Sequence, residues 1–167
     1  NSKDIISDAY ENGVPMGSDL ILKEDQSPSF FIWAAKDPSK TSLQRIQIIK
    51  GWVEDGEGKE AVIDVACSDG LSVDPDTNRC PDNGATVDLT NCEITPNKGA
   101  KELSVVWKDN NFSQDQRAFY YVRVLENPTC RWSTYDAIRA GVQPRPGMKA
   151  TIQDRAWSSP IWYQPNT

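Results

Sequence analysis

The acidic side chains of this sequence gather in one segment where they could bind a metal ion. Four aspartates, Asp69, Asp74, Asp76 and Asp82, lie within a stretch rich in Gly, Pro and Asn. Carboxylates and backbone carbonyls are the ligands that a hard cation such as Ca²⁺ requires, although this spacing is not that of an EF-hand. The ordinary alternative is a solvated acidic loop around a disulfide. Calcium is therefore one of two hypotheses for this segment, and we predict no other metal site.

The absence of histidine limits the remaining chemistry. The 167 residues include no His, which removes the usual general base, the usual zinc ligand and every Ser–His or Cys–His nucleophile pair. A pair of carboxylates can serve a glycosidase without histidine, but nothing in the sequence places two of them ~5 to 9.5 Å apart. We therefore predict no catalytic residue and no cofactor in this chain.

The four cysteines, Cys67, Cys80, Cys92 and Cys130, predict disulfides. They lie among polar segments rich in Asp, Asn, Gly and Pro, whereas a free structural thiol usually lies in an apolar run. Structural zinc is the rival interpretation, but the spacings are far from those of CxxC pairs. Of the three possible connectivities we favour the local one, Cys67–Cys80 with Cys92–Cys130. Disulfides indicate an oxidising compartment, so we expect an exported protein, periplasmic or extracellular.

The composition is that of a soluble globular protein and argues against some partners. The mean hydropathy is -0.60, and no apolar run is long enough to span a membrane. The chain has 18 Lys and Arg against 24 Asp and Glu, a formal charge of -6. Because binding to phosphates needs a basic face, we expect no nucleic acid partner. Residues 1–13 lack the apolar segment of a signal peptide, so the export signal is expected upstream.

Aromatic residues are the first candidates for ligand contacts. Trp132 and Tyr135 lie near a predicted loop and short helix, where we expect their rings to be exposed and able to stack on a sugar. Three other tryptophans are in phase with apolar strand residues and are expected in the core: Trp33, Trp52 and Trp107.

Arg123 is a candidate ligand or domain contact of a different kind. It lies inside the apolar segment RAFYYVRVL, on the same face as Phe119 and Tyr121. An unpaired guanidinium is costly in such surroundings, so Arg123 needs a carboxylate or carbonyl partner. Structural pairing is the default interpretation, and a contact at a domain boundary is the alternative. The same two interpretations apply to Arg45 and Arg155.

The elements that must position these residues are mainly strands, with two short helices. Residues 2–13 predict a helix that ends at Gly13, and residues 14–28 predict an irregular connection. A second short helix is expected near 134–140, where Ser133 and Asp136 resemble a capping box and Gly141 follows as a stop signal.

The strand pattern predicts the fold class. The apolar run 30–35 is typical of a central strand covered on both faces, whereas residues 43–53 alternate and indicate a strand covered on one side. Asp55-Gly56 predicts a hairpin turn into residues 61–66, and residues 68–85 predict an irregular loop. Further strands are expected at 86–94, 102–107, 117–125 and 151–163, the last interrupted by Pro160. We predict a mainly β, antiparallel β-sandwich-like domain.

Four longer segments carry a resemblance to a known family. They are NGVPMGSDL at 12–20, LQRIQIIKGW at 43–52, QRAFYYVRVLENPTCRWSTYDAIRAG at 116–141 and TIQDRAWSSPIWY at 151–163. Together they resemble the C-terminal part of the bacterial domain-of-unknown-function family number 3604, from about Gly13 to Tyr163. Ser18 stands where relatives tend to have glycine. The segments CSDG and RCPDNG resemble members that share this cysteine framework, which supports pairing Cys67 with Cys80.

The resemblance implies an accessory role. In that family the preceding, larger part resembles metal-dependent hydrolases of the polymerase-and-histidinol-phosphatase type, and its His and Asp ligands have no matching position here. Residues 1–28 then form a helix and connection from a preceding domain, and residues 29–167 form a C-terminal β domain. We expect this chain to be non-catalytic and to brace the hydrolase part of a larger exported polypeptide, which is its partner. The alternative is an independent carbohydrate- or surface-ligand-binding β module anchored by Trp132 and Tyr135.

Overall fold

The computed structural model describes residues 2–165, which form a mainly β structure with a short helix near each end. In chain order the elements are α1 (Ser2–Asn12), β1 (Asp19–Leu20), β2 (Ser29–Ala35), β3 (Leu43–Glu54), β4 (Glu57–Cys67), β5 (Glu102–Lys108), β6 (Ala118–Glu126), β7 (Thr129–Cys130), α2 (Trp132–Ala140), β8 (Thr151–Ile152), β9 (Arg155–Trp157) and β10 (Ile161–Tyr163). Both predicted helices are present.

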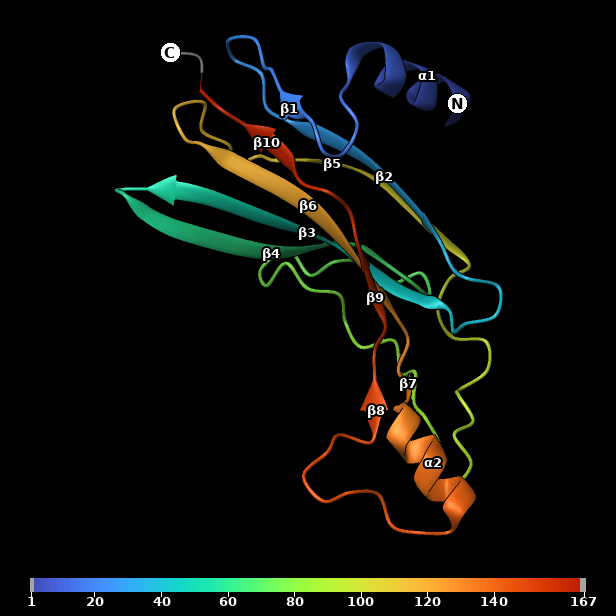
Figure 1. The fold of residues 1–167 in the computed structure, drawn as a ribbon. Helices are drawn as coiled ribbons and strands as arrows, with labels where there is room; N and C mark the ends of the chain where they lie inside the picture. The colour runs from blue at the N-terminus through green and yellow to red at the C-terminus, as the bar shows by residue number, and fades with distance from the viewer. Residues whose placement is uncertain (1, 166–167) are drawn as a thin grey trace.

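Two sheets face each other across the core, as the predicted β-sandwich-like fold requires (Figure 1). The larger sheet has the order β1-β10-β6-β3-β4, and β9 adds to β6 beside β10. The smaller sheet consists of β2 and β5, which pair antiparallel along their whole length. The core between them is built around five buried residues: Ile32, Ile46, Ile48, Ala118 and Tyr120.

The strand that is covered on both faces is β3, and the prediction that residues 30–35 form such a central strand is wrong. β3 pairs with both β4 and β6 and is buried on both faces, with Ile49 as well as Ile48 only 1% exposed. β2 pairs with β5 alone, so its inner residue Ile32 is buried while Trp33 is 61% exposed. A continuous apolar run therefore does not identify a central strand here, because the outward side chains of β2 stay uncovered.

Of the three tryptophans expected in the core, two are placed as predicted. Trp52 and Trp107 pack half-buried against the core residues. Trp33 does not, because alternation along β2 turns it to the outer face.

Residues 86–94 do not form the predicted strand. The segment contains one isolated bridge, between Val87 and Ile94, around a turn in which Cys92 has a φ of 62°. The Asp88 carboxylate accepts the Thr90 backbone N–H at 2.8 Å, and the Asn91 side chain accepts that of Glu93 at 2.9 Å. These local side-chain bonds compete with strand pairing and favour the turn.

A small unit of α2, β7 and β8 extends from one end of the sheets (Figure 1). α2 begins at Trp132, two residues before the predicted start, and the cap position is Arg131 without a side-chain bond. The expected capping box of Ser133 does not form, because Ser133 lies within the helix. Gly141 ends the helix as predicted, with a φ of 65°.

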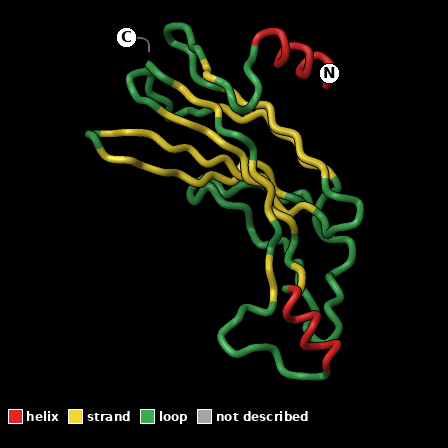
Figure 2. Tube along the Cα trace, in the orientation of Figure 1, coloured by secondary structure: helices red, strands yellow, loops and turns green. Residues whose placement is uncertain are grey.

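Both predicted disulfides are present. Cys67 is bonded to Cys80, and Cys92 to Cys130, so all four cysteines are paired. The first bridge ties the end of β4 to the loop that follows it. The second joins the same long loop to β7. Figure 2 shows this loop running between the sheets and the α2 unit.

Candidate functional site

The outer face of β2 and β5 exposes apolar side chains. Phe31 lies opposite Val106, and Trp33 is the next outward residue of β2. Their exposed fractions are 38%, 55% and 61%. We call these three residues the outer surface. Glu102 and Lys108, which are also exposed, stand at the two ends of β5 and border it with charge. An apolar centre with a charged rim is the composition of a protein interface.

Helix α1 carries a second uncovered apolar face. Ile6 and Tyr10 lie one helical turn apart and are 46% and 86% exposed, and Ala9 between them is exposed as well. An amphipathic helix gains its stability by burying such a face. In this chain the helix ends where Gly13 donates its N–H to Ala9 O at 3.0 Å, and the face is left open.

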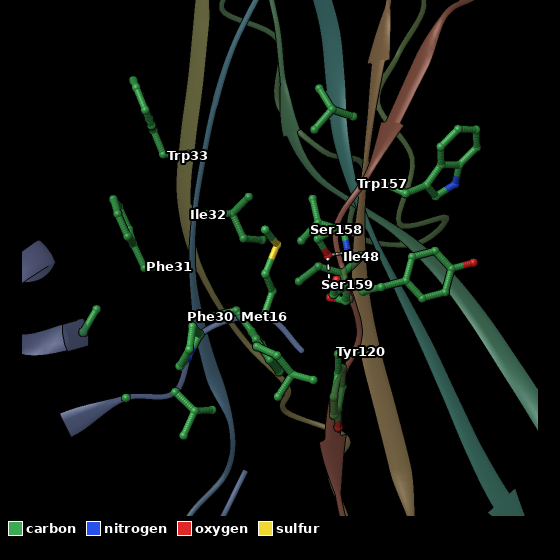
Figure 3. A pocket seen from close by; sticks show the side chains of 18 of the residues that line it. Met16, Phe30, Phe31, Ile32, Trp33, Ile48, Tyr120, Trp157, Ser158 and Ser159 are labelled. Atoms are coloured by element: carbon green, nitrogen blue, oxygen red, sulfur yellow. Dashed lines mark hydrogen bonds between the residues drawn. The ribbon is translucent and has the colours of Figure 1, made fainter. Parts of the chain in front are cut away.

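A cleft of about 690 Å³ lies beside the unpaired edge of β2, and α1 and the outer surface both border it. Ile6 and Tyr10 line it from the helix, and Phe31 and Trp33 from β2. Figure 3 shows Ile32 and Met16 directed into the cleft, while Phe31 and Trp33 point to the opposite side of β2. The two uncovered apolar faces therefore belong to one region of the molecule.

The opposite wall of this cleft is the break between β9 and β10. Ser158 lies there, and its Oγ accepts the Val122 backbone N–H at 2.9 Å and donates to Ser159 O at 3.0 Å. The segment after α1 is fixed to the same place, because Gly17 N–H donates to Pro160 O at 2.9 Å and β1 pairs with β10. The connection from α1 is thus anchored to the larger sheet.

Arg123 belongs to a polar network on the face of the larger sheet that is turned away from the core. Its Nε donates to Gln47 Oε1 at 2.7 Å, and Gln47 in turn donates to the buried Asp64. The partner is an amide oxygen rather than a carboxylate. Asp64 also accepts the Cys80 backbone N–H at 2.8 Å and lies 3.5 Å from Arg79.

Arg45 joins the same carboxylate, with its Nε 3.6 Å from Asp64 Oδ2, and this Nε is buried without a hydrogen bond. Arg45 is thus structurally paired, which is the default interpretation for these arginines. Arg155 is exposed on β9, opposite Leu125.

The same face of the larger sheet exposes two tryptophans. Trp162 pairs with Phe119 and is 46% exposed, and Trp157 pairs with Arg123 and is 59% exposed. The ring of Phe119 lies over Gly51, where an added Cβ would be 2.2 Å from the ring. This close approach explains a glycine inside the interior strand β3.

Three of the four aspartates of the candidate calcium site use their carboxylates in separate local hydrogen bonds, and Asp76 contributes its backbone N–H to one of them. Asp69 accepts the Gly99 N–H at 2.9 Å and the Ser68 hydroxyl at 2.8 Å. Asp74 accepts the N–H groups of Asp76 and Thr77, and Asp82 accepts that of Gly84. These hydrogen bonds lower the pKa of Asp74. Within residues 2–165, no three His, Cys, Asp or Glu residues are grouped as a metal site would need.

Trp132 and Tyr135 are exposed on α2, as expected from the sequence, with exposed fractions of 70% and 38%. They lie three residues apart, so their side chains share one side of the helix. The neighbouring Thr134 is buried and donates its hydroxyl to Ala150 O at 2.8 Å, which fixes the helix to the strand after it.

The sequence interpretation missed a buried ion pair. Lys50 Nζ lies 2.6 Å from Asp109 Oδ2, which also accepts the Tyr120 hydroxyl at 2.8 Å. Lys50 and Asp109 are 6% and 3% exposed. Burial and the bond to Asp109 raise the pKa of the Tyr120 hydroxyl, so it remains a donor. The only sequence signal was a lysine within the apolar run of residues 46–53.

The comparisons with known proteins identify one family. Its model, described as a protein of unknown function (DUF3604), matches residues 1–165 of the chain. No curated protein and no solved structure matches. Neither helix in the described part of the chain is long and apolar enough to cross a membrane.

Proposed function

Because this chain belongs to the DUF3604 family, we propose that it is a non-catalytic accessory β domain that braces the preceding hydrolase part of a larger exported polypeptide. The observation that carries the proposal is the outer surface, an apolar sheet face left open beside the equally open apolar face of α1. Uncovered apolar patches of this kind mark interfaces in soluble proteins.

The preceding part of the polypeptide is the occupant that fits this surface. α1 comes directly before the β domain, and Tyr10 lines the same cleft as Phe31 and Trp33. If the preceding part of the polypeptide covers both the outer surface and the apolar face of α1, α1 is also the segment that connects it to the β domain. The anchoring of Gly17 to Pro160 fixes the path of the connection, so the two parts would be held in one orientation.

Export is proposed on the two disulfides, which persist in an oxidising compartment. Both bridges are internal to the chain, so they stabilise this domain and make no link to another polypeptide.

Hydroxyl-radical footprinting of the full-length gene product tests the brace. Trp33 and Trp132 are 61% and 70% exposed in this chain, so each is the internal standard for the other. We expect Trp33 to be modified several-fold more slowly than Trp132, because the preceding part covers only the outer surface. Equal modification of the two rings, or a native polypeptide that by mass spectrometry lacks a preceding part, would contradict the proposal.

A substitution sharpens this test. Trp33→Asp places a charge in the outer surface and should increase proteolytic cleavage between the two parts of the full-length protein. Trp132→Asp, at the far end of the molecule, is the matched control and should leave the cleavage rate unchanged.

The second candidate function is a ligand-binding module anchored by Trp132 and Tyr135, favoured by their exposure on one side of α2. A glycan array probed with the wild-type protein and Trp132→Ala distinguishes it. Binding that is lost in the variant supports the module, and binding that is unaffected by the variant excludes these anchors.

A further inference from the structure

A second cleft, of about 410 Å³, opens where β3 and β4 meet the end of β5. Its lining combines two tryptophans with four side-chain amides: Trp52, Trp107, Asn78, Asn110, Asn111 and Gln116. It shares Lys108 with the charged border of the outer surface, but none of its lining residues borders the cleft beside α1. Its volume lies within the range of small-molecule binding sites.

The charges that line this cleft cancel. Lys50 and Lys108 supply two positive charges, and Glu54 and Asp109 supply two negative ones, so the lining sums to zero. The whole chain, by contrast, has a formal charge of -6. A ligand that fits this lining is therefore polar but uncharged.

The floor of the cleft is fixed before any ligand arrives. Lys50 Nζ is 2.6 Å from Asp109 Oδ2 and donates to Asn111 O at 3.1 Å. Asp109 is held in turn by the Tyr120 hydroxyl at 2.8 Å and by the Asn111 N–H at 2.9 Å. The Lys50 Nζ also lies over the rings of Trp52 and Tyr120, 5.3 and 5.8 Å from their centroids, so the ammonium holds the floor of the cleft rigid.

This combination matches the chemistry of a sugar. The C–H faces of a sugar ring pack on aromatic rings, and each hydroxyl both donates and accepts, which amide side chains can satisfy with their NH₂ and carbonyl groups. We propose that the cleft between Trp52 and Trp107 binds a neutral saccharide unit. This binding goes beyond the bracing role and does not depend on it.

The test is a glycan array probed with the full-length protein, followed by calorimetric titration of the strongest neutral oligosaccharide. Asn111→Ala and Gln116→Ala shorten side chains that line the cleft, keep the backbone contacts of Asn111, and should leave the fold intact. Each should weaken binding by about fivefold, the effect of one lost hydrogen bond. Trp107→Phe, which keeps an aromatic ring in the core, should weaken it further.

Trp33→Ala and Trp132→Ala are the controls and should bind as the wild type does. The proposal is overturned by an array without a neutral hit, by a preference for acidic glycans, or by binding that Asn111→Ala and Gln116→Ala leave unchanged. Footprinting of Trp33 reports on the bracing role alone, so the two proposals can fail separately.

Discussion

The paired sheets and the long loop between β4 and β5 (residues 68–101) are stabilised in different ways. The sheets enclose apolar side chains, and Ile46, Ile48 and Ile49 are at most 1% exposed. The loop buries polar groups instead, such as Ser68 and Asn83, and adds two disulfides. Apolar packing tolerates changes of shape that conserve volume, whereas buried polar groups need particular partners. The sheets should therefore respond to lost volume, and the loop to lost bonds.

The largest expected effect is a loss of volume in the sheets. Ile48→Ala removes a buried side chain from the interior strand β3 and should lower the free energy of unfolding by about 4 kcal/mol. Urea denaturation measures this change. Val53→Ala, on the same strand at a position that is 49% exposed, should cost less than about 1 kcal/mol. Equal losses at the two positions would show that the core does not dominate the stability of the sheets.

The second expected effect is a difference in stability between variants that lack one or the other disulfide of the loop. The two disulfides close loops of different length, with sequence separations of 38 for Cys92–Cys130 and 13 for Cys67–Cys80. Loop-closure entropy then stabilises the folded state by at most about 4 kcal/mol for the first and at most about 3 kcal/mol for the second. The pair Cys92→Ser and Cys130→Ser should therefore lower the cooperative melting temperature. The pair Cys67→Ser and Cys80→Ser should mainly loosen residues 68–85.

Calorimetry and hydrogen exchange of the two double variants check this order. A larger decrease in melting temperature for the Cys67–Cys80 double variant than for the Cys92–Cys130 double variant would contradict this order.

The same contrast explains which features the sequence could predict. The sheets follow from periodicity, and the hairpin of β3 and β4 turns at Asp55 and Gly56 as expected, both with positive φ. Periodicity cannot tell which apolar strand is covered on both faces, because that depends on the neighbouring strands, and so it assigns this place to residues 30–35 instead of β3. The apolar pattern of residues 86–94 indicates a strand, because it carries little trace of side-chain hydrogen bonds such as that from the Thr90 N–H to Asp88.

The third effect is a loss of bonds in the loop. Asn83 is 4% exposed. Its Nδ2 donates to Asn127 Oδ1 at 2.9 Å and to Asp69 Oδ2 at 2.9 Å. Its Oδ1 accepts a hydrogen bond from Gln44 Nε2 at 3.2 Å. Asn83→Ala leaves these buried groups without this partner and should cost about 2 kcal/mol. Hydrogen exchange should also rise at Gly99, whose N–H bonds to Asp69.

Asn91→Ala is the matched control, because Asn91 is exposed in the same loop and makes a single turn bond to Glu93. It should cost less than about 1 kcal/mol. Similar losses in the two variants would mean that the loop does not depend on its buried amides.

The candidate sites also divide into features that the sequence predicts and features that depend on the tertiary structure. Exposure of Trp132 and Tyr135 followed from their place near a loop, and the need of Arg123 for a partner followed from its apolar neighbours. The outer surface could not be predicted, because a run such as SFFIWAA carries no sign of which face stays uncovered. The cleft of Trp52 and Trp107 unites residues from five separate segments, and only the sheet register brings them together.

The smallest effect concerns a carboxylate at the junction of the sheets and the loop. Glu126 ends β6, and its Oε2 is buried without a hydrogen bond among the described residues. Burial, and then the nearby charge of Asp154, raise the pKa of Glu126 above 4.5, while Lys40 opposes the shift. The folded state therefore holds this proton more tightly than the unfolded state, so stability falls as pH rises from about 4.5 through the folded pKa.

Glu126→Gln removes that penalty and should stabilise the protein at pH 7 by no more than about 0.5 kcal/mol, since the side chain is only partly buried and solvent screens its charge. At pH 4, where the wild-type group is largely protonated in both states, the two proteins should be equally stable. Urea denaturation at both pH values measures the difference, with Glu57→Gln, an exposed carboxylate on β4, as the control. A wild type that gains stability relative to Glu126→Gln as the pH rises would show that Glu126 has a stabilising partner when ionised.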